Sequence, residues 1–305
     1  MNAFDFRSGS VLWFGCVSAI ALGFANNDRL NRQATTAWAQ ETAPTSDADA
    51  TVTLLRRLTD VGLQIEPGQR VTIPAPIMLA DESNVRGEDL AGRLGWARFS
   101  KATIVAPVWM DLEYLKDDHG RRIGHSVHFR FVVHQPLSKL RDRDWMQSVF
   151  GESSEDADGG YRKVGEDELP MEWKRGAESI RHGFVEVPLM NRVVVRGLVS
   201  GTTEDHGAGT VMAWRLEDTV PSASSLSSTW AAIERDDLGA KREGPMFAYR
   251  GAGGFLNLQP LSSVDESMNN ACLVEGRLIL REPEGWFGGS NFLRSKFSIL
   301  IQEAA

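Results

Sequence analysis

Residues 103–133 read TIVAPVWMDLEYLKDDHGRRIGHSVHFRFVV, and this stretch gives the clearest indication of the fold. Apolar and polar residues alternate in both halves, which is the period of a β-strand with one buried face. Between them, residues 116–122 are charged residues around Gly120, a composition typical of a turn. The stretch therefore predicts a hairpin of two antiparallel strands, 103–115 and 125–133. The predicted buried faces are Ile104, Val108, Met110, Leu112 and Tyr114, then Val127, Phe129, Phe131 and Val133, with Asp111 and Glu113 facing outward.

The same alternation recurs along the chain. We expect further strands at 184–200, 210–216, 255–258, 271–281 and 296–302, and helices at 51–61, 84–94 and 136–150. Short polar turns join most strands, whereas a parallel sheet needs helical crossovers. The sequence thus predicts an α+β fold, mainly antiparallel β-hairpins in a β-rich domain with a few short helices.

The predicted domain covers residues 51–305. Residues 40–50 are small and polar, and we expect a disordered linker there. The acidic segment 151–168 is predicted to be a surface loop. Residues 105–110 resemble residues 185–190, so an alternative is two similar halves that meet near the Ser-rich segment 221–229.

The first 39 residues predict an export signal. Arg7 precedes an apolar run over 11–25, which is shorter than the about 20 residues of a membrane-spanning helix. Ala37 and Ala39 fit the small residues before a signal-peptidase cleavage site. We expect cleavage after Ala39 and a periplasmic or secreted protein. Cleavage after Ala25 is an alternative, and an uncleaved run 11–25 would leave a membrane tether.

The charge of the mature chain limits its expected partners, and its cysteine content bears on disulfide formation. Residues 40–305 hold 30 Lys and Arg against 39 Asp and Glu, a net charge of −9. Such a chain repels phosphate, so neither nucleic acid nor an anionic membrane is expected as a partner. No later segment is apolar enough to span a membrane. Cys272 is the one cysteine left, and its pattern predicts a buried thiol rather than a disulfide.

Local motifs assign no catalytic residue, metal site or cofactor. His125, His128 and His134 lie on one predicted strand, but they do not converge as zinc ligands must, and we expect exposed or half-buried strand histidines. Residues 154–160 mimic part of a calcium loop but lack its end positions. The chain also contains no Gly-x-Ser-x-Gly or His-Glu-x-x-His motif. The sequence does not exclude a glycosidase whose catalytic carboxylates come together from distant segments of the chain.

An aromatic, Gly-rich cluster near the C-terminus gives the candidate binding residues. Tyr249 and Arg250 precede Gly251-Ala252-Gly253-Gly254, and Trp286 and Phe287 follow Glu282-Pro283-Glu284-Gly285. One interpretation is an aromatic surface that recognises a protein or a saccharide. The other is a packed turn that closes one end of the core, because aromatic rings are large apolar groups to bury.

These segments also resemble a family of exported bacterial proteins of unknown function. The resemblance rests on Tyr-x-Gly-Ala-Gly-Gly at 249–254, Glu-Pro-x-Gly-Trp-Phe at 282–287 and Leu-Arg-Ser-Lys at 293–296. It implies export and one continuous domain, and it carries no activity or site residue.

Two functional hypotheses follow. The first is a non-catalytic envelope or periplasmic protein that binds a partner or assembles. The alternative is an exported hydrolase, a glycosidase or esterase. Two carboxylates about 5–9 Å apart in a deep pocket, or a Ser–His hydrogen bond, would favour the hydrolase.

Overall fold

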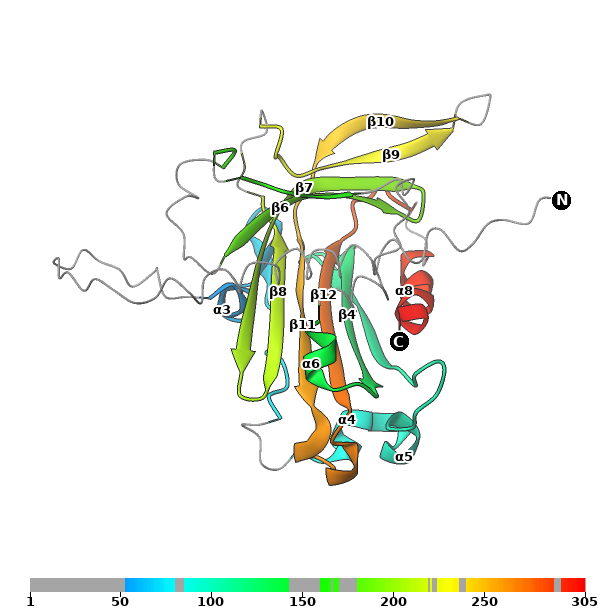
Figure 1. The fold of residues 1–305 in the computed structure, drawn as a ribbon. Helices are drawn as coiled ribbons and strands as arrows, with labels where there is room; N and C mark the ends of the chain where they lie inside the picture. Colours follow the sequence, from blue (N-terminus) through cyan, green and yellow to red (C-terminus); the bar gives the residue numbers. More distant parts are fainter. Residues whose placement is uncertain are drawn as a thin grey trace, which may run out of the picture.

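The hairpin of residues 103–133 lies at one edge of a large antiparallel sheet in the computed structural model of the protein (Figure 1). Its strands are β3 (Trp109–Lys116) and β4 (Arg122–Val133). The Asp117 amide donates to the Arg121 carbonyl oxygen at 2.9 Å and closes the predicted turn. The hairpin is therefore confirmed.

The predicted buried face of this hairpin is confirmed within the strands and wrong before them, and β4 is buried on its other face as well, where Val132 joins a second cluster. Phe129 and Phe131 are buried, and Asp111 is exposed. The first strand begins at Trp109 rather than at Thr103, because Pro107 has no N–H to donate to a ladder. Ile104, predicted to be buried, lies in the loop before the strand and is fully exposed.

The structure describes residues 53–79, 85–142, 160–165, 167–169, 180–218, 220, 224–235, 240–287 and 292–304. The predicted signal peptide and the linker 40–50 lie outside these residues. Among the described residues no helix is both long and apolar enough to cross a membrane.

Ten described strands form one antiparallel sheet, which confirms the β-rich α+β class. The strand order is β10-β9-β7-β8-β11-β12-β4-β3, while β6 pairs with β7 and β5 pairs with β6. Strands before and after the Ser-rich segment are neighbours, since β8 pairs with β11 and β7 with β9. The remaining strands are β5 (Gly160–Lys163), β6 (Arg181–Leu189), β7 (Val193–His206), β8 (Gly209–Leu216), β9 (Thr229–Arg235), β10 (Lys241–Ala248), β11 (Ala252–Pro260) and β12 (Cys272–Arg281).

Strand β7 changes partners along its length and joins two parts of the sheet. Residues 193–196 pair with β9, and residues 199–206 pair with β8. At the change, a Cβ on Gly197 would lie 2.2 Å from the Ser228 hydroxyl oxygen, so glycine permits the close approach. In Figure 1, β6, β7, β9 and β10 consequently cross the ends of β8, β11, β12 and β4.

Helix α8 (Phe292–Ala304) packs its apolar side into the main core. The predicted strand at 296–302 is therefore wrong. Alternating Phe297, Ile299 and Ile301 imitate a strand, but the buried residues Leu293, Phe297 and Ile301 are four apart, the spacing of one helix face. Ile299 is exposed. The core that α8 joins contains Val127, Phe129, Phe131, Val185, Val195, Val274 and Leu278 from the sheet.

The N-terminal part covers the opposite face of the sheet. Helix α3 (Leu54–Arg56), a π-helical turn (Arg57–Val61), β1 (Leu63–Glu66) and β2 (Gln69–Val71) pack over β8, β11 and β12. A second cluster lies under α4 (Gly87–Ala91), a 3₁₀ turn (Gly92–Leu94) and α5 (Trp96–Phe99). The predicted helices at 51–61 and 84–94 are thus confirmed as short helical segments.

Two further predictions differ from the structure, and one hairpin of the structure has no counterpart among the predictions. Helix α6 (Leu137–Leu140) ends well before residue 150, and residues 143–150 lie outside the described part. Strand β5 occupies part of the predicted loop 151–168. The β9–β10 hairpin was not predicted, because β10 is exposed along its length and has no buried face to mark it.

Candidate functional site

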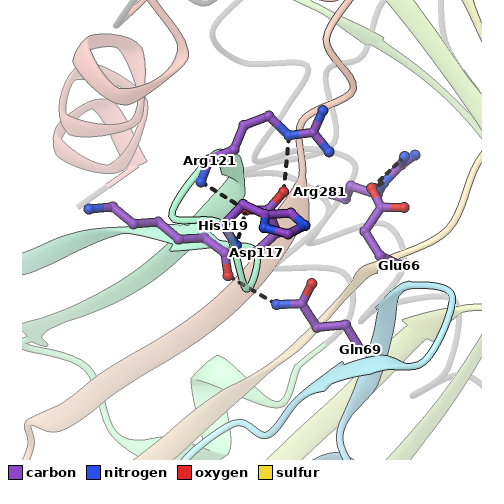
Figure 2. Close-up of polar contacts among 7 residues, drawn as sticks. Glu66, Gln69, Asp117, His119, Arg121 and Arg281 are labelled. Carbon is purple, nitrogen blue, oxygen red and sulfur yellow. Dashed lines mark hydrogen bonds and ion pairs between the residues drawn. The ribbon is translucent and has the colours of Figure 1, made fainter.

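An open pocket of about 520 Å³ lies at one end of the sheet. Its walls come from the end of β1, the β3–β4 turn and the segment that follows β12. Charged side chains of both signs dominate it, and they lie close together in Figure 2. The lining residues are Glu66, Arg121, Arg122, Ile123, Arg281, Glu282, Pro283 and Glu284.

Hydrogen bonds within the β3–β4 turn position the arginine residues of that side of the pocket, Arg121 and Arg122. Asp117 Oδ1 accepts hydrogen bonds from the backbone N–H groups of His119 and Arg121, at 3.0 and 2.8 Å. Burial opposes ionisation of Asp117, but these bonds and the Arg121 side chain outweigh it and lower the pKa of Asp117. Gln69 Nε2 donates to the Lys116 carbonyl oxygen at 3.0 Å and ties β2 to the same turn (Figure 2).

Ion pairs hold the charged side chains of the pocket. Arg281 donates through Nε and Nη2 to Glu66 Oε1, at 2.9 and 2.7 Å. Arg122 Nη2 donates to Glu282 Oε1 at 3.1 Å. The Glu66–Arg281 pair joins two strands that are 215 residues apart in sequence. The pocket is therefore lined by hydrogen-bond donors and acceptors that ion pairs hold in place, and it does not have an excess of positive or negative charge.

A buried histidine supports the pocket carboxylate from behind. His125 Nε2 lies 2.5 Å from Glu282 Oε2, and both side chains are almost inaccessible to solvent. The His125 ring also packs on the rings of Tyr114 and Phe297. Glu282 thus meets a cation on its pocket side and an imidazole on its core side. The expectation of an exposed or half-buried strand histidine is wrong for His125.

The four predicted binding residues lie behind this pocket rather than in it. Tyr249, Trp286 and Phe287 are buried, and Arg250 is half-buried. The Tyr249 ring stacks on Trp286 with centroids 5.3 Å apart, and its hydroxyl donates to the Arg281 carbonyl oxygen at 2.9 Å. Burial raises the pKa of this phenol. These contacts favour the packed-turn interpretation, in which the aromatic residues fix the backbone that carries Arg281 and Glu282.

A second polar cluster lies on the face of the sheet covered by the N-terminal segment. Glu275 is fully buried and accepts hydrogen bonds from Ile77 N at 2.8 Å and Asn257 Nδ2 at 3.1 Å. His128 Nε2 lies 3.0 Å from its other oxygen. Asn257 Nδ2 also donates to the Ile77 carbonyl oxygen at 2.7 Å. The cluster thereby fastens residues 77–79 to the sheet.

The buried cluster shifts the pKa values of its members. Burial lowers the pKa of His128, although the Glu275 carboxylate opposes this. For Glu275, burial raises the pKa, but hydrogen bonds from His128, Ile77 and Asn257 outweigh it and leave the pKa lowered. Glu275 is therefore ionised and fully engaged in holding the fold.

A serine and a histidine meet on neighbouring strands β6 and β7. Ser200 Oγ lies 2.9 Å from His182 Nδ1. Burial, and then the charge of Arg215, lower the pKa of His182 to about 4. Ser200 is buried, and neither residue lines the pocket described above. The pair is the hydrogen bond named as a mark of a hydrolase, yet its serine is inaccessible to a substrate.

No group of three or more His, Cys, Asp or Glu side chains arranged for a metal ion occurs in the described part of the chain. His125 and His128 point to opposite faces of β4, toward different carboxylates. Residues 154–159 of the partial calcium loop lie outside the described residues. Cys272 is a free, buried thiol.

The charged residues that line the pocket are not predicted from the sequence. Arg121 and Arg122 belong to the segment 116–122, whose composition predicts only a turn, and Glu282 belongs to the motif 282–287, whose most unusual residues are aromatic. The signal that could have found the pocket is the pairing of β4 with β12, which brings Gly124 opposite Arg281.

No protein-family model matches this chain, and no curated protein matches it in sequence. The fold and the geometry of the site are therefore the basis for a functional proposal.

Proposed function

We propose that this chain is an exported, non-catalytic binding protein whose ligand occupies the Arg–Glu pocket. The observation that carries the proposal is the pairing of charges along the pocket wall. Glu66 is bound by Arg281, and Glu282 is bound by Arg122 and His125. Carboxylates held in this way are poor nucleophiles or bases, but they are rigid hydrogen-bond acceptors.

The balance of charge supports a neutral, hydroxyl-rich ligand, of which a small saccharide is the simplest case. Arginine and glutamate are equally represented among the lining residues. Each lining arginine is already paired with a carboxylate, so a strongly anionic ligand would have to break an existing ion pair to gain a new one. A sugar hydroxyl both donates and accepts, so it can bridge a guanidinium and a carboxylate without breaking their pair.

Calorimetric titration of the full chain tests this proposal. The probes are maltose, trehalose and N,N′-diacetylchitobiose, with glucose 6-phosphate and spermidine as charged comparisons. We expect saturable binding of a neutral disaccharide and at least a tenfold weaker affinity in Arg281→Gln and in Glu284→Gln. Glu284 is exposed in the pocket, so its substitution leaves the core intact.

A matched control separates pocket effects from a change of surface charge. Glu266→Gln alters an exposed glutamate outside the pocket and should leave the affinity unchanged. The proposal fails if no neutral disaccharide binds while a charged probe does, or if Arg281→Gln binds as tightly as the unaltered chain.

An exported hydrolase is the second candidate, and the Ser200–His182 hydrogen bond favours it. Against it stand the burial of Ser200 and the lowered pKa of His182, which makes the imidazole a weak base. A screen with p-nitrophenyl esters and p-nitrophenyl glycosides distinguishes the hydrolase from the binding protein. Turnover that Ser200→Ala abolishes would replace the binding proposal with an esterase.

Export itself is part of the proposal and has its own test. The sequence of residues 1–39 supports a cleaved signal, and the burial of Cys272 supports an inert thiol in an oxidising compartment. Mass spectrometry of the mature protein should find Gln40 as the first residue. A mature chain that starts at Met1 or Asn26 would contradict cleavage after Ala39.

A further inference from the structure

Each arginine that lines the pocket forms an ion pair with a carboxylate, and Figure 2 shows two of these pairs. The pairs are Arg121–Asp117 at 3.0 Å, Arg122–Glu282 at 3.1 Å and Arg281–Glu66 at 2.7 Å. Arginine and glutamate are equal in number among the lining residues, but Asp117, which is not one of them, takes the charge of Arg121. The third lining glutamate, Glu284, is exposed and has no partner among the described residues. One carboxylate of the pocket is therefore free to bind a cation.

The backbone that carries Glu284 is held on both sides by neighbouring contacts. On one side, the Glu282 amide donates to the Ile123 carbonyl oxygen at 2.8 Å. On the other side, the Trp286 amide donates to the Pro283 carbonyl oxygen at 3.0 Å and closes a turn over residues 283–286. The proline ring also fixes its own φ angle, and the Trp286 side chain is buried. The turn therefore places the free carboxylate on a backbone that is fixed relative to the pocket.

A free carboxylate beside three ion pairs favours one kind of charged group on a ligand. A ligand ammonium can donate to Glu284 without breaking any ion pair of the pocket, whereas a ligand anion would have to displace a carboxylate from an arginine. A hydrogen bond between an ammonium and a carboxylate is also stronger than one between neutral groups. The charges of the three arginines are compensated by their partners, so they oppose a single ammonium only weakly.

We propose that the pocket prefers an amino sugar, a saccharide with a free ammonium group, and that Glu284 binds this ammonium. The inference rests on the proposed function, because the sugar hydroxyls still have to bridge the paired arginine and glutamate side chains. Glu284 is exposed, and water screens an exposed ion pair strongly. The ammonium should therefore tighten binding about threefold to fivefold relative to the neutral saccharide.

Calorimetric titration of the full chain with matched pairs of disaccharides tests the inference. The pairs are chitobiose with N,N′-diacetylchitobiose, and 2-amino-2-deoxytrehalose with trehalose. Within each pair the ring skeleton is the same, and the amine is replaced by an acetamide or a hydroxyl. At pH 6 we expect the amino member of at least one pair to bind about threefold to fivefold more tightly than its neutral counterpart. At pH 10 this gain should vanish, because an amine with a pKa of about 8 is then neutral.

Two variants locate the group that binds the ammonium. Glu284→Gln keeps the size of the side chain but removes its charge, so it should bind both members of each pair equally. Asp118→Asn is the matched control, because Asp118 is an exposed carboxylate of the β3–β4 turn that does not line the pocket. This control should keep the preference for the amine. Circular dichroism verifies that both variants are folded, which is expected because both side chains are exposed.

Failure of the inference and failure of the proposed function give different results. If a neutral disaccharide binds and neither amine binds more tightly, the preference for an amino sugar is wrong and the saccharide pocket stands. A preference that persists in Glu284→Gln, or that Asp118→Asn loses as well, would overturn the contact with Glu284. If no disaccharide binds, neutral or amino, the proposed function is wrong and the inference falls with it.

Discussion

Removing the buried Glu275 carboxylate should be the most damaging single polar substitution on the covered face of the sheet. In Glu275→Ala, Ile77 N, Asn257 Nδ2 and His128 Nε2 lose their common acceptor. Breaking a buried charged pair by deleting one partner costs about 3–5 kcal/mol, because the remaining groups stay desolvated and unpaired. We therefore expect the free energy of unfolding to fall by about 4 kcal/mol.

Urea denaturation followed by far-UV circular dichroism measures this loss. The control is Glu266→Ala, an exposed glutamate whose removal should change the free energy of unfolding by less than about 0.5 kcal/mol. Hydrogen exchange supplies a local readout, because the Ile77 amide should lose its protection in Glu275→Ala. A loss of stability below about 1 kcal/mol, or an unchanged Ile77 amide, would show that Glu275 does not fasten residues 77–79 to the sheet.

The pH dependence of the same substitution follows from the direction of the pKa shift. The pKa of Glu275 is lowered from its ordinary value of 4.5 in the folded chain. Its stabilisation is therefore complete above pH 4.5 and is lost as the pH falls through the lower folded value. The difference between Glu275→Gln and the unaltered chain should shrink in that acidic range. A difference that grows on acidification would contradict the shift.

Three further predictions concern single residues. Burial and the charge of Arg215 lower the pKa of His182 from 6.5 to about 4. The free energy of unfolding should therefore fall by up to about 3 kcal/mol as the pH drops from 6.5 toward 4. Urea titrations of His182→Gln should not show this pH-dependent loss. Burial raises the pKa of Cys272 to about 11, so Ellman's reagent at pH 8 should label the native chain at least about 100-fold more slowly than the unfolded chain; equal rates would exclude the burial. Gly254→Ala would place a Cβ 2.1 Å from a backbone oxygen of β12 and should cost at least about 2 kcal/mol in urea denaturation, whereas Gly160→Ala meets open space and should cost little; equal costs would contradict the close approach.

Much of the sheet could be predicted from the sequence because strand alternation is a local signal. Strand β3 alternates clearly because its outward face is exposed, whereas β4, β7, β11 and β12 are buried on both faces and are marked in sequence by their content of β-branched and other apolar residues. Helix α8 was mistaken for a strand because Phe297, Ile299 and Ile301 fit both periods over a short window. Strand β10 was missed because an exposed strand carries no alternation.

The pocket could not be predicted because its residues are distant in sequence. Glu66 and Arg281 meet only after β1 packs against β11 and β12 is paired, and no local spacing encodes that contact. The aromatic residues Tyr249 and Trp286 were visible as unusual, yet their size indicated packing as well as recognition. The loop at Ile104 was concealed for a related reason, since its residues continue the alternation of a strand that begins only at Trp109.

We propose that a neutral saccharide binds between the arginine and glutamate side chains at the end of the sheet. NMR titration of the arginine Nε–Hε resonances with a neutral disaccharide would detect this contact at individual residues. We predict saturable shifts for Arg122 and Arg281 and none for Arg93 and Arg98, which lie outside the pocket. Uniform small shifts, or larger shifts at Arg93 and Arg98 than at Arg281, would contradict the account.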